Sequence, residues 1–252
     1  MSYTVHRAVD RFTTTTGWLS SAHSFSFGDH YDPENTHHGV LLVHNDEVLR
    51  PGQGFDTHPH RETEIITWVR SGSLVHQDSH GHSGIVYPGL AQRMSAGTGI
   101  EHSERNDTWS ATDGVRVEGA GTVDVSYVQM WVMPDEFGRD PGYDQADVSA
   151  ELERGGLIPI ASGDPALDSA IRIASRSATF WVARLKRGER ARIPAGRFAH
   201  IFVSDGRLRF DEVELAAGDA ARGGDLGGGE LVGDAEGASE ALIWVMGKTI
   251  GE

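Results

Sequence analysis

The sequence predicts an all-β protein built from β-sandwiches or β-barrels, and three observations lead to this fold class. Short runs of apolar and β-branched residues recur along the 252-residue chain. Turns marked by Gly and Pro separate these runs at intervals of about 8–12 residues. The 32 glycines are spread through the chain and form no low-complexity tract. Short strands with frequent turns are typical of sandwiches and barrels.

The first half of the chain carries its strand signals between residues 40 and 132. Residues 40–49 are expected to form a hairpin that turns at Asn45-Asp46. Further strands are expected at residues 64–69, 73–77, 84–87 and 126–132. This half is therefore predicted to form one β domain, residues 1–135.

A polar and acidic segment at residues 136–156 is predicted to be a linker, with a short helix at 148–154. After it the β pattern resumes. Strands are expected at residues 179–185, 200–203, 208–210, 231–232 and 242–246. The two halves are weakly alike, because each has a glycine-containing turn before a histidine. We therefore predict a second domain, residues 157–252, that is related to the first by duplication.

Composition and charge exclude several classes of function. The chain has no cysteine, so disulfides and thiolate metal sites are impossible. Its net charge is -15, with 37 acidic and 22 basic residues, and an acidic chain without a clustered basic footprint disfavours nucleic-acid binding. No signal-peptide pattern and no apolar run of about 18 residues is present, so we expect a cytoplasmic protein that does not bind membranes.

Two short histidine motifs predict a metal site. Residues two apart on a strand point to the same face, so His58 and His60 should project together, as should His102 and Glu104. Pro59 supports a special strand, because proline is confined to sheet edges and bulges. Three imidazoles and one carboxylate suit a divalent transition metal such as iron, nickel, copper, zinc or manganese. A mixed set of this kind leaves coordination positions open for substrate, water or dioxygen.

The segments GFDTHPH at residues 54–60 and SAGTGIEHSE at 95–104 resemble the pirin family and its bacterial quercetinase-like members. The segment SFSFG at 24–28 is similar to the opening of that family. The resemblance implies a bicupin, two stacked jelly-roll β-barrels, in which the N-terminal barrel alone keeps a metal. It assigns the ligands to His58, His60, His102 and Glu104, and iron(II) is the expected metal by analogy.

The resemblance also implies an enzyme, a dioxygenase that cleaves a flavonol such as quercetin with dioxygen. Glu104 would be both a metal ligand and the base that accepts the proton of the flavonol hydroxyl. The expected partners are an aromatic substrate and dioxygen, and the expected state is a monomer. One alternative is a non-enzymatic metal-sensing or redox-sensing regulator that acts through protein partners. Another is a different cupin reaction, such as isomerisation or oxidation of a small acid.

Other polar residues near the motifs have secondary roles in this prediction. Glu64 is expected to be a buried, hydrogen-bonded carboxylate rather than a ligand. His76 or Asp78 could bind the second ring nitrogen of a ligand histidine. Solvated, structural or outward-facing positions are expected for His80, His82, His200 and Glu101. The aromatic residues that could line a substrate pocket are Phe25, Phe27, Phe55, Trp68 and Trp109.

Overall fold

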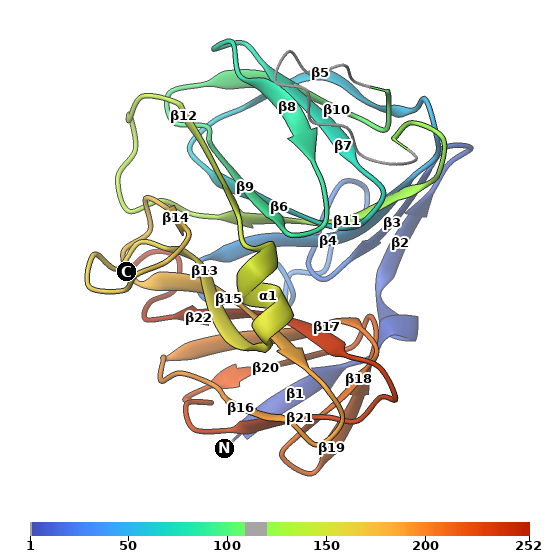
Figure 1. The fold of residues 1–252 in the computed structure, drawn as a ribbon. Coiled ribbons are helices and arrows are strands. Elements are labelled where there is room, and N and C mark those ends of the chain that lie inside the picture. The colour runs from blue at the N-terminus through green and yellow to red at the C-terminus, as the bar shows by residue number, and fades with distance from the viewer. Residues whose placement is uncertain (1, 109–119) are drawn as a thin grey trace. The chain divides into compact units, whose positions relative to one another are not determined.

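The computed structural model describes residues 2–108 and 120–252 and is built almost entirely of β-strands (Figure 1). The chain divides into two compact units. We call residues 12–33 and 42–147 the histidine unit. We call residues 1–11, 34–41 and 148–252 the terminal unit, because it contains both ends of the chain. The prediction of an all-β protein is confirmed.

The histidine unit contains a seven-stranded sheet, in the order β12-β9-β6-β11-β4-β3-β2, and a four-stranded sheet, in the order β5-β10-β7-β8. Its strands are β2 (Phe12–Thr15), β3 (Leu19–His23), β4 (Leu41–Leu49), β5 (Gly54–His60), β6 (Glu64–Ser71), β7 (Leu74–Asp78), β8 (Ser83–Val86), β9 (Leu90–Ser95), β10 (Ile100–Arg105), β11 (Val125–Val132) and β12 (Gly142–Asp147).

The terminal unit contains a seven-stranded sheet, in the order β1-β20-β17-β22-β15-β13-β14, and a four-stranded sheet, in the order β16-β21-β18-β19. Its elements are β1 (Ser2–His6), η1 (Ala8–Asp10), α1 (Ser149–Arg154), β13 (Gly156–Ser162), β14 (Ile171–Arg172), β15 (Ala178–Leu185), β16 (Arg190–Arg192), β17 (Phe198–Asp205), β18 (Arg207–Phe210), β19 (Val213–Ala216), β20 (Ala220–Gly224), β21 (Glu230–Gly233) and β22 (Ser239–Met246).

Strand β1 belongs to the terminal unit although it begins the chain. It pairs antiparallel with β20, from Ser2 opposite Gly224 to His6 opposite Ala220. This pairing satisfies backbone groups along an edge of β20 that would otherwise attract other strands.

The interior of the terminal unit is apolar. Inward-facing residues of its strands form one buried cluster that includes Leu208, Phe210, Leu231 and Ile243, each 0% exposed. The histidine unit has smaller clusters, one around Leu74 and Tyr127 and another around Ile65, Met94 and Ile100. Polar side chains occupy much of the remaining interior, and the candidate site lies among them.

The strands predicted after residue 60 are confirmed, and their ends lie within three residues of the predicted positions. The hairpin predicted at residues 40–49 is wrong, because β4 runs unbroken from Leu41 to Leu49. The polar pair that indicated a turn is accommodated inside the sheet. Asn45 Oδ1 lies 3.0 Å from His23 Nδ1, and Asp46 forms an ion pair with Arg70.

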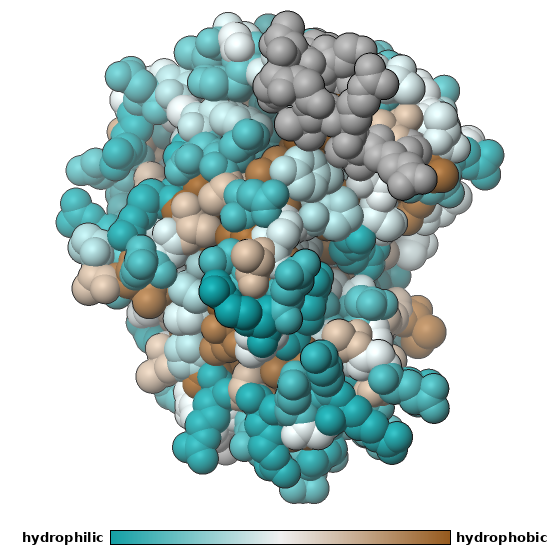
Figure 2. Space-filling model, in the orientation of Figure 1, coloured by the Kyte–Doolittle hydropathy of each residue, from teal (hydrophilic) through white to brown (hydrophobic). Residues whose placement is uncertain are grey.

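The segment predicted to be a linker, residues 136–156, contains β12 and α1, and its last residue, Gly156, begins β13. The helix expected at 148–154 is α1, and β12 pairs with β9 over six residues. Figure 2 shows a hydrophilic surface where α1 faces the viewer. This agrees with the burial of α1, in which Leu152 is the buried residue among those described. No helix in the described part of the chain is long and apolar enough to cross a membrane. The domain boundaries at 135 and 157 stay a prediction.

Candidate metal centre

Two antiparallel neighbours in the four-stranded sheet, β5 and β10, carry the histidine motifs. His58 is paired with His102, and Pro59 with Glu101. β5 is an edge strand of its sheet, as the proline predicted. Gly54 allows β5 to begin against β10, because a Cβ there would collide with the backbone oxygen of Glu104. The sequence thus brings the two motifs into register.

Burial along β10 follows the predicted alternation. His102 and Glu104 are 1% and 2% exposed, whereas Glu101 is exposed to solvent. The register shifts between His102 and Glu104, yet both side chains stay on the inner face. The parity argument for these two residues is therefore confirmed.

Three imidazoles meet in the interior of the unit. His58, His60 and His102 each offer a nitrogen within 4.8 Å of the others. Their ring centroids lie 4.9 Å (His58 to His60), 4.5 Å (His58 to His102) and 4.8 Å (His60 to His102) apart. Burial, followed by the neighbouring imidazoles, lowers the pKa of His60 and of His102 to about 3. Neutral imidazoles are the form that binds metals.

Hydrogen bonds set the tautomers of two of these rings. His58 Nδ1 donates to the backbone oxygen of Asp56 at 2.7 Å, which leaves its Nε2 as a bare acceptor. His76 Nε2 donates to Asp78 Oδ2 at 3.4 Å, so His76 Nδ1 accepts from His102 Nδ1 at 3.4 Å. The Nε2 of His102 is then also a bare acceptor.

The residues fit a metal ion on the evidence of two buried nitrogens. Within the described residues, Nε2 of His60 and Nε2 of His102 are buried and have no hydrogen-bond partner. Buried polar atoms are normally satisfied, and a buried nitrogen without a partner needs an explanation. A cation shared by the three rings would supply one, and the chain Asp78-His76-His102 matches the support that metal-binding histidines receive.

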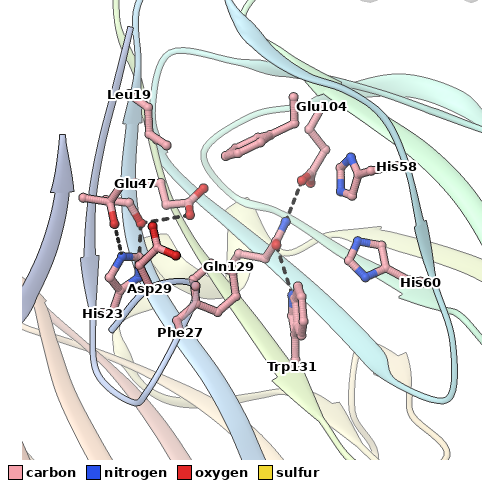
Figure 3. A pocket seen from close by; sticks show the side chains of 14 residues that line it. Leu19, His23, Phe27, Asp29, Glu47, His58, His60, Glu104, Gln129 and Trp131 are labelled. Carbon is pink, nitrogen blue, oxygen red and sulfur yellow. Dashed lines mark hydrogen bonds between the residues drawn. The ribbon is translucent and has the colours of Figure 1, made fainter. Parts of the chain in front are cut away.

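Glu104 lies beside the three imidazoles, and hydrogen bonds from Gln129 and Thr67 hold its carboxylate. Gln129 Nε2 donates to Glu104 Oε2 at 2.6 Å, and Trp131 Nε1 donates to Gln129 Oε1 at 3.0 Å (Figure 3). Thr67 Oγ1 donates to Glu104 Oε1 at 3.5 Å. Burial raises the pKa of Glu104, and His76 and Gln129 oppose that rise. The potential ligand atoms of Glu104, His76 and His102 lie within 4.8 Å of one another. His102 therefore belongs both to this group and to the group of three imidazoles.

A cavity of about 310 Å³ opens beside these side chains. His58, His60, Glu104, Gln129 and Trp131 all line it. Its walls also carry the apolar side chains of Leu19, Phe27 and Phe55. Cavities of roughly 300–1,000 Å³ with mostly apolar walls and few polar groups are typical of small-molecule sites.

Comparison with known proteins assigns the family. A model of the family described as Pirin matches residues 5–132. A Mycobacterium tuberculosis protein named "Putative quercetin 2,3-dioxygenase" is 52% identical over 249 residues, 98% of this chain and 96% of that protein. The chain belongs to the pirin family. Another pirin relative, the Escherichia coli K12 protein named "Quercetin 2,3-dioxygenase", is 36% identical over 216 residues, 85% of this chain and 87% of that protein.

A solved pirin structure shares the whole fold. The bacterial pirin YhhW from Escherichia coli, in complex with nickel(II), superposes with a TM-score of 0.84 at 32% sequence identity. The match covers 98% of this chain and all of that one. The pirin resemblance and the bicupin fold predicted from the sequence are therefore confirmed.

The other polar residues near the motifs of this pirin lie where the sequence predicted them. Glu64 is 3% exposed and accepts a hydrogen bond from Ser95 Oγ at 2.8 Å, as expected of a buried structural carboxylate. His80 and His82 are exposed, and His76 supports His102. His200 is buried and accepts from Arg222 Nε at 3.1 Å.

The aromatic residues proposed as pocket walls divide into three groups. Phe27 and Phe55 line the cavity, as predicted. Phe25 and Trp68 are instead core residues, each 1% exposed, and are absent from the cavity lining. Trp109 lies outside the described residues. Gln129 and Trp131 were missed, although their i, i+2 spacing in an apolar strand signals a shared face.

Proposed function

We propose that this pirin is a metal-dependent dioxygenase that cleaves a flavonol of the quercetin type. The ligands would be His58, His60, His102 and Glu104. The main support is the pair of buried, unmet Nε2 atoms beside a cavity with aromatic walls. Further support comes from relatives that carry the name quercetin 2,3-dioxygenase.

The donor set accepts iron(II), nickel, copper, manganese or zinc. A bound ion of this kind would act as a Lewis acid that polarises a substrate oxygen. Nickel has a precedent in the pirin YhhW, whose structure is a complex with nickel(II).

The chain's own residues would bind the substrate and handle its proton. Phe27, Phe55 and Trp131 would hold a flat ring system in the cavity and exclude water from it. Glu104 Oε1, whose hydrogen bond from Thr67 is the longer one, would accept the proton of the flavonol hydroxyl. Gln129 would hold Glu104 Oε2 in place throughout.

A cavity of this size also favours an enzyme over a regulator that only senses metal or redox state. A sensor needs no space for a flat organic molecule next to its ligands. The regulator remains the alternative if no turnover is found.

The test is metal analysis followed by a quercetin assay in air. The purified protein is reconstituted separately with each candidate ion, and loss of the flavonol absorbance is followed. We expect metal-dependent cleavage that His58→Ala abolishes and Glu104→Gln reduces. His80→Ala is the matched control, because His80 is an exposed histidine outside the cavity. Bound metal without turnover for any ion would reject the dioxygenase, and no bound metal would reject the site.

A further inference from the structure

A second polar cluster lines the same cavity, on the side remote from the histidine motifs. Figure 3 shows His23 and Glu47 across the cavity from His58 and His60. These residues come from β3 and β4 of the seven-stranded sheet, whereas the histidine motifs come from the four-stranded sheet. The cavity is therefore polar at both ends.

The hydrogen bonds of this cluster leave acceptor capacity on Glu47. His23 uses both ring nitrogens within the cluster, towards Thr14 Oγ1 at 2.9 Å and Asn45 Oδ1 at 3.0 Å. Glu47 Oε1 accepts from Ser21 Oγ at 3.1 Å, and Oε2 accepts from the hydroxyl of Tyr127 at 2.6 Å. A carboxylate has about four acceptor positions, so each oxygen of Glu47 retains one.

Glu47 is also a costly residue to place where it lies. It is 4% exposed, and burial raises its pKa to about 7 against the opposing hydrogen bonds from Tyr127 and Ser21. Burying a carboxyl group costs free energy of desolvation that an apolar residue of similar size would not cost. Glu47 lines the cavity, so its remaining acceptor positions are available to a bound ligand.

Between the two polar ends the cavity walls are apolar, with Leu19, Phe27 and Phe55 among them. A flat ring system with hydroxyl groups at opposite ends matches this distribution. One end would face the histidines, and a hydroxyl at the other end would donate to Glu47.

We propose that Glu47 determines specificity by accepting a hydrogen bond from a substrate hydroxyl at the end remote from the histidines. The pocket then selects polyhydroxylated aromatic substrates over the same ring system without that hydroxyl. This inference rests on the proposed function for its choice of substrate. A hydrogen bond to a buried carboxyl group changes affinity by roughly 10–100-fold, which is enough to set a preference.

The test compares quercetin with 3-hydroxyflavone, which lacks all other hydroxyls, in wild type and Glu47→Gln. We expect Glu47→Gln to lower kcat/KM for quercetin about 10-fold and that for 3-hydroxyflavone less than about 2-fold. Ser21→Ala removes one hydrogen bond to Glu47. It should lower the ratio of kcat/KM for quercetin to kcat/KM for 3-hydroxyflavone by about 3-fold. This milder variant keeps the test decisive if Glu47→Gln does not fold.

The matched control is Glu64→Gln, another buried glutamate of the same unit that does not line the cavity. It should leave the substrate ratio unchanged. Equal losses on both substrates in Glu47→Gln would show a merely structural role and overturn the inference. The absence of any loss on quercetin would overturn it as well.

Binding without turnover separates this inference from the proposed function. Dissociation constants for both compounds are measured by calorimetry on the metal-loaded protein without oxygen. A preference for quercetin that Glu47→Gln removes would support the inference even if no cleavage occurs in air, which would reject the dioxygenase alone. Failure of the wild type to bind either compound would overturn both.

Discussion

In the histidine unit, β10 lies between β5 and β7 and places His102 opposite His58. In the terminal unit, β21 lies between β16 and β18 and places Leu231 opposite Ala191. The two four-stranded sheets have equivalent strand orders, and the compared pairs occupy equivalent places in them. One pair brings two imidazoles close together, and the other pair contributes only hydrocarbon to an apolar core.

The difference teaches that strand order alone does not make a site. The terminal unit uses the arrangement to bury one continuous apolar cluster. The histidine unit gives up part of that burial for imidazoles and carboxylates that cost free energy to desolvate. Function on such folds resides in particular side chains, and proteins accept some loss of stability at those positions.

The largest expected effect comes from making the histidine unit more like its neighbour. We expect His60→Leu to lower metal affinity about 1,000-fold, since the four proposed ligands would share a binding free energy on the order of 10–16 kcal/mol. The metal-free variant should be more stable by about 1 kcal/mol, because a buried unmet nitrogen is removed. Metal analysis and urea unfolding of the metal-free protein measure the two effects. A metal-free variant that is less stable than the metal-free wild type would contradict the inference that His60 lowers the stability of the histidine unit.

The reverse exchange should be costly in the terminal unit. Leu231→His places an imidazole in an apolar interior where Leu231 is 0% exposed. We expect a loss of about 3 kcal/mol in the free energy of unfolding. Urea unfolding provides the measurement. Val9→His is the control, because Val9 is 91% exposed and should tolerate the change.

Buried ionisable groups should make the stability of the histidine unit depend on pH in two opposite ways. The raised pKa of Glu47, about 7 in the folded state, favours folding below its ordinary value of 4.5, and this contribution is lost as pH rises to 7. The lowered pKa of His60, about 3, acts oppositely, since folding is disfavoured as pH falls from 6.5.

The variant Glu47→Gln isolates the first of these contributions. The stability difference between wild type and Glu47→Gln should change by an amount on the order of 2 kcal/mol between pH 4.5 and pH 7, in favour of the variant at pH 7. Tyr127, Ser21, Glu104 and Asp46 influence Glu47 and are unchanged in the variant. Thermal unfolding of the metal-free proteins across this range measures it. A constant difference would show that Glu47 ionises normally.

The smallest expected effect concerns the support of His102. Asp78→Asn weakens the chain through His76, and we expect metal affinity to fall about 10-fold with little loss of stability. Competition with a chelator gives the affinity. His82→Ala should have less effect, because it leaves the contact between Asp78 and His76 intact.

The strands that the sequence revealed are those with a concentrated apolar signal. β6, β11, β15 and β22 are almost continuously apolar or β-branched, and all were predicted. β1, β2 and β12 were missed, because SYTVH, FTTT and GYDQAD are short and polar. Pairing with a neighbour, which local sequence does not contain, makes them strands.

The same limit applies to the site. His58, His60, His102 and Glu104 are i, i+2 pairs on two strands, so parity alone predicted that each pair shares a face. Glu47 reaches the cavity from the other sheet, and its Oε2 accepts a hydrogen bond from Tyr127, 80 residues away. Contacts between sheets follow from tertiary packing, which spacing along one strand cannot reveal.

The pairing of β1 with β20 has a consequence for how the protein is made. β1 is synthesised before its partner β20, and residues 220–224 follow it on the order of 10–40 s later at ribosomal rates of about 5–20 residues per second. All residues of the histidine unit have been synthesised by residue 147. All residues of the candidate metal centre are therefore present about 70 residues before β20 is made, whereas β1 has no strand partner until residues 220–224 have been synthesised.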